Sequence, residues 1–161
     1  MEEILDTLDY HGNIDKTYEL ASKGQRFTNY FIDFIGYMIL SLIIGFVLGM
    51  ILVYFGNISY LFEEEGTLKS KIIEWVLGLI ILTGYYTIME YFFKGKTLGK
   101  LITGTRAVTL ENERMDLYTT FIRTICRFIP FEPFSFLGDK AEGWHDSLSK
   151  TKVIVDKGWN D

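Results

Sequence analysis

The residues of this sequence best suited to chemistry are charged side chains that lie in or beside long apolar stretches. From Phe27 to Phe55 the chain carries one charge, Asp33, and Arg26 directly precedes that stretch. Roughly 29 residues exceed the ~20 that a helix needs to cross a bilayer. Arg26 and Asp33 are about two helical turns apart, so their side chains project from nearly the same face. A carboxylate facing lipid costs about 2.5–3.5 kcal/mol, so we expect Asp33 to face protein or water.

Both residues have a structural and a functional interpretation. Arg26 can serve as an interface anchor whose guanidinium extends to lipid phosphates. Asp33 can be a buried partner of Arg26, Asn29 or Tyr37, or it can carry a cation or a proton. The sequence leaves these alternatives open, and it places the functional chemistry of the chain on this first apolar helix.

A second apolar run covers residues 72–93 and has no charge between Glu74 and Glu90. It is long enough to span a bilayer if its ends lie at the interface. Glu90 is expected to pair with Lys94 one turn further along the helix, or alternatively to face Asp33. We therefore predict two spans, at about 27–55 and 72–93.

The predicted fold class is an α-helical membrane protein: an antiparallel two-helix transmembrane hairpin with a cytoplasmic amphipathic helix and a small β element. A polar arm at 1–22 precedes the membrane domain at 23–156, and a short tail follows at 157–161. The β-prone segment 105–110 is expected to pair with a strand at about 151–155.

Asp116 is a plausible N-cap for a helix over residues 117–129, in which apolar and polar residues occupy opposite faces. The polar face carries Arg123 and Arg127, which disfavours a membrane-spanning placement and favours the interface. Together with Asp146, these arginines are expected to form a structural polar layer beneath the membrane. His145, next to Asp146, suggests a proton relay only weakly.

Composition excludes several classes of function. The net charge of −5 comes with no basic stripe, so we expect no nucleic-acid partner. Cys126 is the only cysteine, which excludes an internal disulfide and four-cysteine metal sites. No nucleophile–base pair or HExxH motif is present, so we expect neither an enzyme nor a bound cofactor or metal.

Lysine and arginine residues near the span ends predict the orientation. Four of them crowd after the second span, at Lys94, Lys96, Lys100 and Arg106, and two precede the first span. The connecting loop has only Lys69 and Lys71, fewer than the group after the second span. Both termini are therefore expected in the cytoplasm.

Three motifs in order carry a resemblance to a known family. They are GQRFTNYFID at the first helix, GKTLGKLITGTRAV after the second, and RFIPFEPFSFLG followed by GWHDSLSKTKVIV. Over about residues 22–156 the chain resembles the RDD family of small bacterial membrane proteins, named for one arginine and two aspartates. The resemblance places these at Arg26, Asp33 and Asp146. It implies a bacterial plasma-membrane protein, and it suggests transport, including sodium/proton exchange for some members.

Three functional hypotheses follow. The first is an oligomeric transporter of ions or small solutes, since two spans cannot enclose a pathway. The second is a structural or regulatory subunit that binds another membrane protein and does not transport. The third is binding of anionic lipid head groups by Arg123 and Arg127. In each case the lipid bilayer is a partner, together with a second copy of the chain or another membrane protein.

Overall fold

The computed structural model of this protein describes residues 18–56, 68–135 and 142–157. Three sequence-based assignments lie wholly or largely outside the described residues. They are the predicted polar arm up to residue 17, the loop between the spans at 57–67, and the tail from residue 158 onward.

Two long helices dominate the structure, α2 (Lys23–Tyr54) and α4 (Leu68–Phe92). Helix α2 begins four residues before the predicted span because Ser22 and Gln25 form a capping box. The Ser22 hydroxyl accepts from the Gln25 amide at 3.2 Å, and the Gln25 side chain accepts from the Ser22 amide at 2.9 Å. This pair satisfies two amide donors that a helix start otherwise leaves unbonded.

Both helices are long and apolar enough to cross a membrane, over Lys23–Tyr54 and Ser70–Phe92. In the most apolar 18-residue window of α2, 0% of the residues are buried within the structure, and in that of α4 only 11% are. The central helix of a soluble protein buries its apolar residues, so this exposure indicates helices whose apolar surface is covered by something outside the chain.

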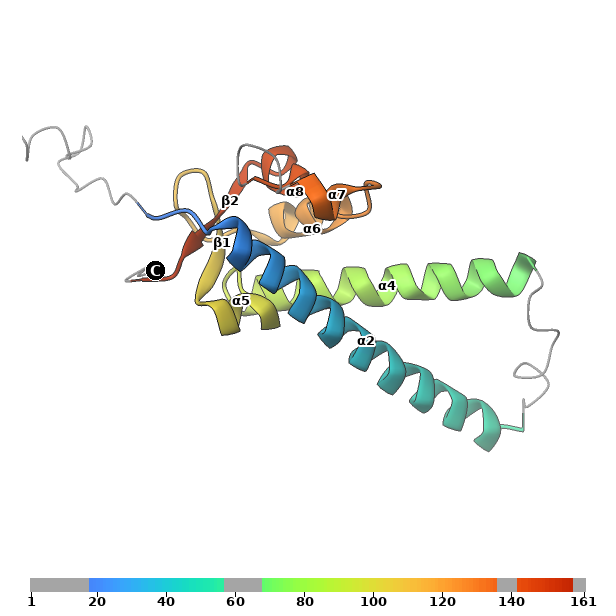
Figure 1. Ribbon diagram of the computed structural model, residues 1–161. Coiled ribbons are helices and arrows are strands. Elements are labelled where there is room, and N and C mark those ends of the chain that lie inside the picture. Colours follow the sequence, from blue (N-terminus) through green and yellow to red (C-terminus); the bar gives the residue numbers. More distant parts are fainter. Residues whose placement is uncertain (1–17, 57–67, 136–141, 158–161) are drawn as a thin grey trace, which may run out of the picture.

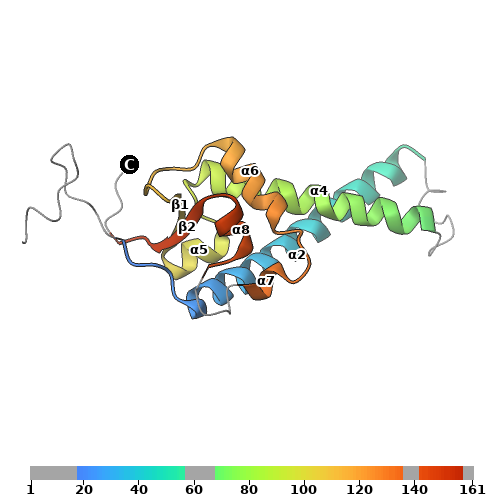
Figure 2. The same cartoon turned by 90° about the horizontal axis from the view of Figure 1, so that it is seen from above.

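The remaining elements gather at one end of the two long helices (Figures 1 and 2). Helix α2 runs away from this end and α4 returns to it, and the two helices diverge toward the opposite end (Figure 1). We call the compact end the base.

A two-stranded antiparallel sheet forms part of the base. Strand β1 (Thr105–Thr109) pairs with β2 (Thr151–Val155), as the sequence predicted, with Thr105 opposite Val155. The segment before α2 continues the sheet, since the Ala21 amide donates to the Val153 carbonyl at 2.9 Å. A small apolar core lies here, formed by Ala21, Ala107, Met115 and Val153.

Helix α5 (Leu98–Thr103) was not predicted from the sequence. Thr97 caps its N-terminus and Gly104, with φ 65°, ends it in the left-handed region. A Cβ at Gly99 would lie 2.3 Å from the Asn29 carbonyl oxygen, so α5 contacts the backbone of α2 at a distance that only glycine allows.

Helix α6 (Leu117–Cys126) begins at the predicted cap, where the Asp116 carboxylate accepts from the Thr119 amide at 2.8 Å. It ends three residues earlier than predicted. The next three amides, those of Arg127, Phe128 and Ile129, bond three residues back in a tightened turn before Pro130. Two short helices follow, α7 (Glu132–Ser135) and α8 (Trp144–Leu148).

Candidate functional site

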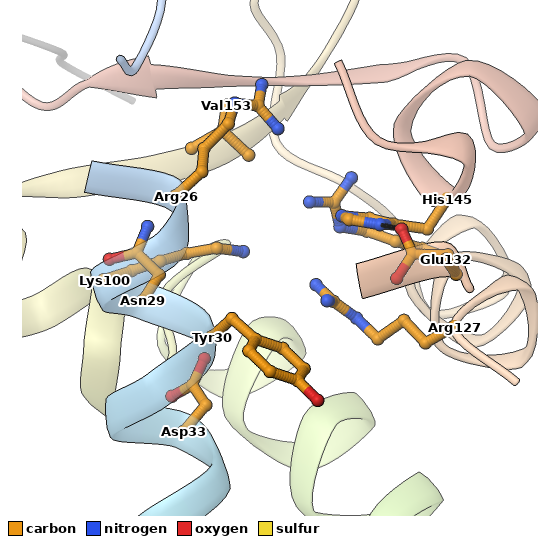
Figure 3. A pocket seen from close by; sticks show the side chains of 10 residues that line it. Arg26, Asn29, Tyr30, Asp33, Lys100, Arg127, Glu132, His145 and Val153 are labelled. Carbon is orange, nitrogen blue, oxygen red and sulfur yellow. Dashed lines mark hydrogen bonds and ion pairs between the residues drawn. The ribbon is translucent and has the colours of Figure 1, made fainter. Parts of the chain in front are cut away.

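The long helix α2 buries polar residues and exposes apolar ones. Its buried residues are Arg26, Asn29 and Asp33, which follow one another at three- and four-residue spacing on one face. That face lies against the base (Figure 3). The expectation that Asp33 faces protein is therefore confirmed in the structure, where 2% of its surface is exposed.

The predicted partners of Asp33 are wrong, because three groups from other elements hold its carboxylate. The Tyr85 hydroxyl donates to Oδ1 at 3.0 Å and the Gly99 amide to the same oxygen at 2.8 Å, while the Thr97 hydroxyl donates to Oδ2 at 2.6 Å. Asp33 thus fastens α5 and α4 to α2.

The other two candidate partners of Asp33 bond elsewhere. The Asn29 amide group hydrogen-bonds the hydroxyls of Thr103 and Thr105, and the Tyr37 hydroxyl donates to the Gly78 carbonyl at 3.5 Å. The Asn29 bonds add a further link between α2 and the chain around the end of α5.

Arg26 pairs with Asp146, 120 residues away in the sequence, rather than with Asp33. Asp146 also binds Arg123, whose Nη1 donates to its Oδ1 and to the Thr151 hydroxyl at 2.5 Å. Burial opposes ionisation of Asp146, but the arginines on both sides, Arg123 foremost, hold the pKa of this carboxyl well below its usual range. Asp146 is therefore a carboxylate bridging α2 and α6.

Glu90 near the end of α4 has three cationic partners. Lys100 Nζ lies 2.6 Å from Oε1, Arg123 Nε lies 3.2 Å from Oε2, and Arg127 Nη2 lies 3.2 Å from Oε1. The sequence pointed to Lys94, one turn further on. The cations that bind the carboxylate instead come from α5, α6 and the residue after α6.

Lys100 is buried beside this carboxylate, with 3% of its surface exposed. Burial lowers the pKa of Lys100 to about 8, against the opposing effect of Glu90. Its ammonium group therefore titrates far closer to neutral pH than that of an exposed lysine.

His145 and Glu132 form a second buried pair at the edge of the network. Burial, followed by the charge of Arg127, lowers the pKa of His145 to about 4, so the imidazole is neutral at pH 7. In that state Nδ1–H donates to the Glu132 carboxylate. Nε2 lies 3.3 Å from Asp146 Oδ1.

The structure thus joins five of the six predicted site residues in one ion-pair network, which we call the base network. Its members are Arg26, Glu90, Lys100, Arg123, Arg127 and Asp146. Asp33, the sixth predicted residue, lies beside the network with partners of its own. Within the residues that the structure describes, no group of three or more His, Cys, Asp or Glu side chains is placed to hold a metal ion.

A cavity of about 30 Å³ lies among these side chains (Figure 3). Lys100 and Arg127 point into the same space from opposite sides, and Arg26 and Tyr30 border it. That volume holds one or two water-sized groups.

Sequence reasoning missed Lys100, Thr97, Tyr85 and Glu132. Lys100 was counted only as an orientation signal. The available signal was Thr97, a threonine directly before Leu98, which is the pattern of an N-cap and would have predicted α5.

Comparison with known proteins decides the family. The RDD family model matches residues 20–150, most of the chain and all of the base network. The chain belongs to the RDD family. A relative from Bacillus subtilis (strain 168), described as "Uncharacterized protein YxaI", is 31% identical over 143 residues, which cover 80% of this chain and 93% of the relative. No solved structure matches the chain significantly.

Membership of this membrane-type family agrees with the exposed apolar surface of α2 and α4, the two helices that are long and apolar enough to cross a membrane. The arginine and two aspartates to which the resemblance pointed have separate tasks in this RDD protein. Arg26 and Asp146 join α2 to α8 directly, whereas Asp33 holds α5.

Proposed function

We propose that this RDD protein transports ions or small solutes as a homo-oligomer in the bacterial plasma membrane. One observation carries the proposal: a buried network of ionisable groups lies at the end where the two candidate spans meet the base, around a water-sized cavity. Ionisable groups at such a position are costly unless they are paired, and in membrane proteins they commonly mark ion or proton pathways.

Assembly is part of the proposal because two spans cannot enclose a pathway. The two helices diverge toward their far ends (Figure 1), and 0% and 11% of their most apolar windows are buried within the chain, which supports this part of the proposal. A Cβ at Gly45 or Gly49 would have no neighbour within 4 Å, so these positions are open to close approach of another helix.

Within the network, Lys100 is the group best suited to exchange a proton near neutral pH, because burial brings its pKa to about 8. Purified protein in sealed vesicles with an internal pH dye should show proton movement driven by an imposed sodium or potassium gradient. Lys100→Arg keeps the positive charge beside Glu90 but cannot deprotonate. We expect this variant to fold and to lose the pH-dependent part of the flux. Protein-free vesicles are the baseline, and absence of flux in the parent protein refutes transport.

The orientation is tested separately. The lysine and arginine distribution supports cytoplasmic termini and a base, with α6, at the cytoplasmic interface. Helix α6 fits this placement because Thr120, Arg123 and Thr124 are buried while Tyr118 and Phe121 are exposed. Reporter fusions at positions 13 and 157 should read cytoplasmic and a fusion at position 64 external. An external signal at 157 contradicts the two-span topology.

A second candidate is a non-transporting structural or regulatory subunit that binds another membrane protein. The observation in its favour is the saturation of Asp33 by three donors from the same chain, which suits a structural carboxylate better than a carrier. Crosslinking in native membranes separates the two candidates: crosslinks between copies favour the transporter, whereas a stoichiometric foreign partner favours the subunit.

A further inference from the structure

Three arginines of the base network have buried N–H groups without a hydrogen-bond partner. Among the described residues, no hydrogen-bond partner is found for Nε and Nη2 of Arg26, Nη2 of Arg123 or Nε of Arg127, and all four atoms are buried. Arg26 and Arg123 are 6% and 0% exposed. A buried donor without an acceptor is unfavourable, and more so on a charged group, so an added acceptor would stabilise this arrangement.

These three arginines and Lys100 line the cavity described above, together with two carboxylates, Asp33 and Glu132. Asp33 already accepts three hydrogen bonds, and Glu132 is bonded to His145. The carboxylates that balance the arginines, Glu90 and Asp146, are not part of the cavity wall. The wall carries four cations against two carboxylates, and Glu90 and Asp146, bonded to those cations from behind, bring the whole cluster to neutrality. The unpaired arginine N–H groups, rather than net charge, therefore make the wall fit an anion with several acceptor oxygens.

A second hollow leads to the same place. A groove of about 190 Å³, mostly apolar, lies between α2 and α4 and is lined by Phe34, Tyr37, Leu82 and Tyr86. Tyr30, Arg127 and Glu132 line both the groove and the cavity, so the two spaces adjoin. An apolar groove on membrane-facing helices that ends at buried arginines matches a molecule with a hydrocarbon chain and an anionic end.

We propose that this site binds an anionic phospholipid with a small head group, such as phosphatidic acid. The phosphate oxygens accept from the free N–H groups of Arg26, Arg123 and Arg127, and an acyl chain lies in the groove along Phe34 and Leu82. The small cavity admits phosphate oxygens and leaves little room for a bulky head group. Arginine suits this task because its planar donors bind two phosphate oxygens at once. The inference does not depend on transport.

The test compares lipids on the purified full-length protein in detergent by native mass spectrometry and thermal unfolding. Phosphatidic acid should remain bound at one per chain and raise the unfolding temperature. Diacylglycerol, which has the same chains and no phosphate, and phosphatidylcholine should be retained at least about tenfold more weakly. Equal retention of all three overturns the proposal. Inorganic phosphate should not reproduce the shift; if it does so without any lipid, the site binds free phosphate and the lipid assignment is wrong.

Arg127→Gln tests the contribution of the site itself, with Arg114→Gln as the matched control. Arg114 is an exposed arginine whose guanidinium donates to the Tyr91 carbonyl outside the cavity. We expect Arg127→Gln to weaken phosphatidic acid binding about tenfold and Arg114→Gln to leave it unchanged. An equal effect of both variants indicates nonspecific attraction and overturns the site. If Arg127→Gln does not fold, the lipid comparison on the parent protein decides alone.

Discussion

Replacing Asp33 with asparagine tests whether this carboxylate holds the base together. Asparagine keeps the size of the side chain and one carbonyl oxygen but removes the charge. In the structure Oδ1 accepts from Tyr85 and Gly99, and Oδ2 accepts from Thr97. The Thr97 hydroxyl also caps α5 by accepting from the Lys100 amide at 3.4 Å. Asp33→Asn therefore disturbs the attachment and the start of α5 together.

The size of the effect follows from the three hydrogen bonds. A hydrogen bond to a charged group contributes about 1.5–3 kcal/mol, and a neutral one about 0.5–1.5 kcal/mol. In Asp33→Asn the two bonds to Oδ1 pass from the first kind to the second, and the bond from Thr97 loses its acceptor because an amide NH2 group cannot accept. Together these changes lower the free energy of unfolding by about 3–6 kcal/mol. Asp33→Ala also leaves three buried donors without an acceptor, so we expect it to cost more, roughly 4–8 kcal/mol.

The assay is unfolding of purified protein in mixed micelles, followed by circular dichroism, together with amide hydrogen exchange. The Gly99 amide should lose protection in Asp33→Asn, because its acceptor becomes weaker. Asp116→Asn is the control: this exposed aspartate caps α6, and asparagine caps a helix equally well. The structural role of Asp33 is refuted if the Asp33→Asn variant is as stable as the parent within about 1 kcal/mol and its Gly99 amide is still protected from exchange.

Three further predictions concern the same base. Glu90→Gln should lower the free energy of unfolding by about 3–5 kcal/mol, since it leaves several buried cations without their shared carboxylate, and Lys100→Met should lower it less. Chemical unfolding of both variants measures this order, and the opposite order contradicts the central role of Glu90. Gly99→Ala should sharply reduce the amount of folded protein, because its Cβ would lie 2.3 Å from the Asn29 carbonyl oxygen. Gly84→Ala is the control: its Cβ has no neighbour within 4 Å, so unfolding should show an unchanged free energy of unfolding or a gain of up to about 1 kcal/mol. The free energy of unfolding should fall by up to about 3 kcal/mol as the pH drops from 6.5 to 4, because His145 binds a proton in the unfolded chain but, with a pKa of about 4, stays neutral in the folded one. His145→Gln should flatten the dependence of stability on pH in this range, and an unchanged slope refutes the role of His145.

The helices and strands were largely predictable from local patterns. Two apolar runs predicted α2 and α4, an aspartate before an apolar stretch predicted the start of α6, and two β-prone segments predicted the sheet and its pairing. Each of these signals depends on neighbouring residues only. The ends of α2 and α6 differed because a capping box and a proline-terminated turn, respectively, set them.

The contacts of the site were not predictable in the same way. Hydrophobic periodicity identifies the buried face of a helix when water is the solvent, but lipid-facing residues are as apolar as core residues. The spacing placed Arg26 and Asp33 on one face of α2, but the pattern gave no sign of which elements cover that face. The pairs expected for Arg26 and Glu90 were local, with Asp33 and Lys94, because sequence distance was the only guide to them. The sequence also grouped Arg123 with Asp146 across two elements, and these two residues do pair. The observed pair of Arg26 with Asp146 joins residues 120 positions apart.

The base network also explains why the two long helices can diverge without loss of the fold. Helices in lipid gain little from burying apolar side chains against each other, so polar contacts and close packing determine how they associate. Here those contacts are concentrated at one end: Asp33 holds α5 and α4, Glu90 holds α5 and α6, and Asp146 joins α2 to α6. The base is fixed by these buried bonds, whereas the distant halves of α2 and α4 have few partners within the chain. A change in the separation of those halves, whether lipid or a second copy covers them, would reach the base through its attachments to the two long helices. These are Arg26 and Asp33 on α2 and Glu90 on α4.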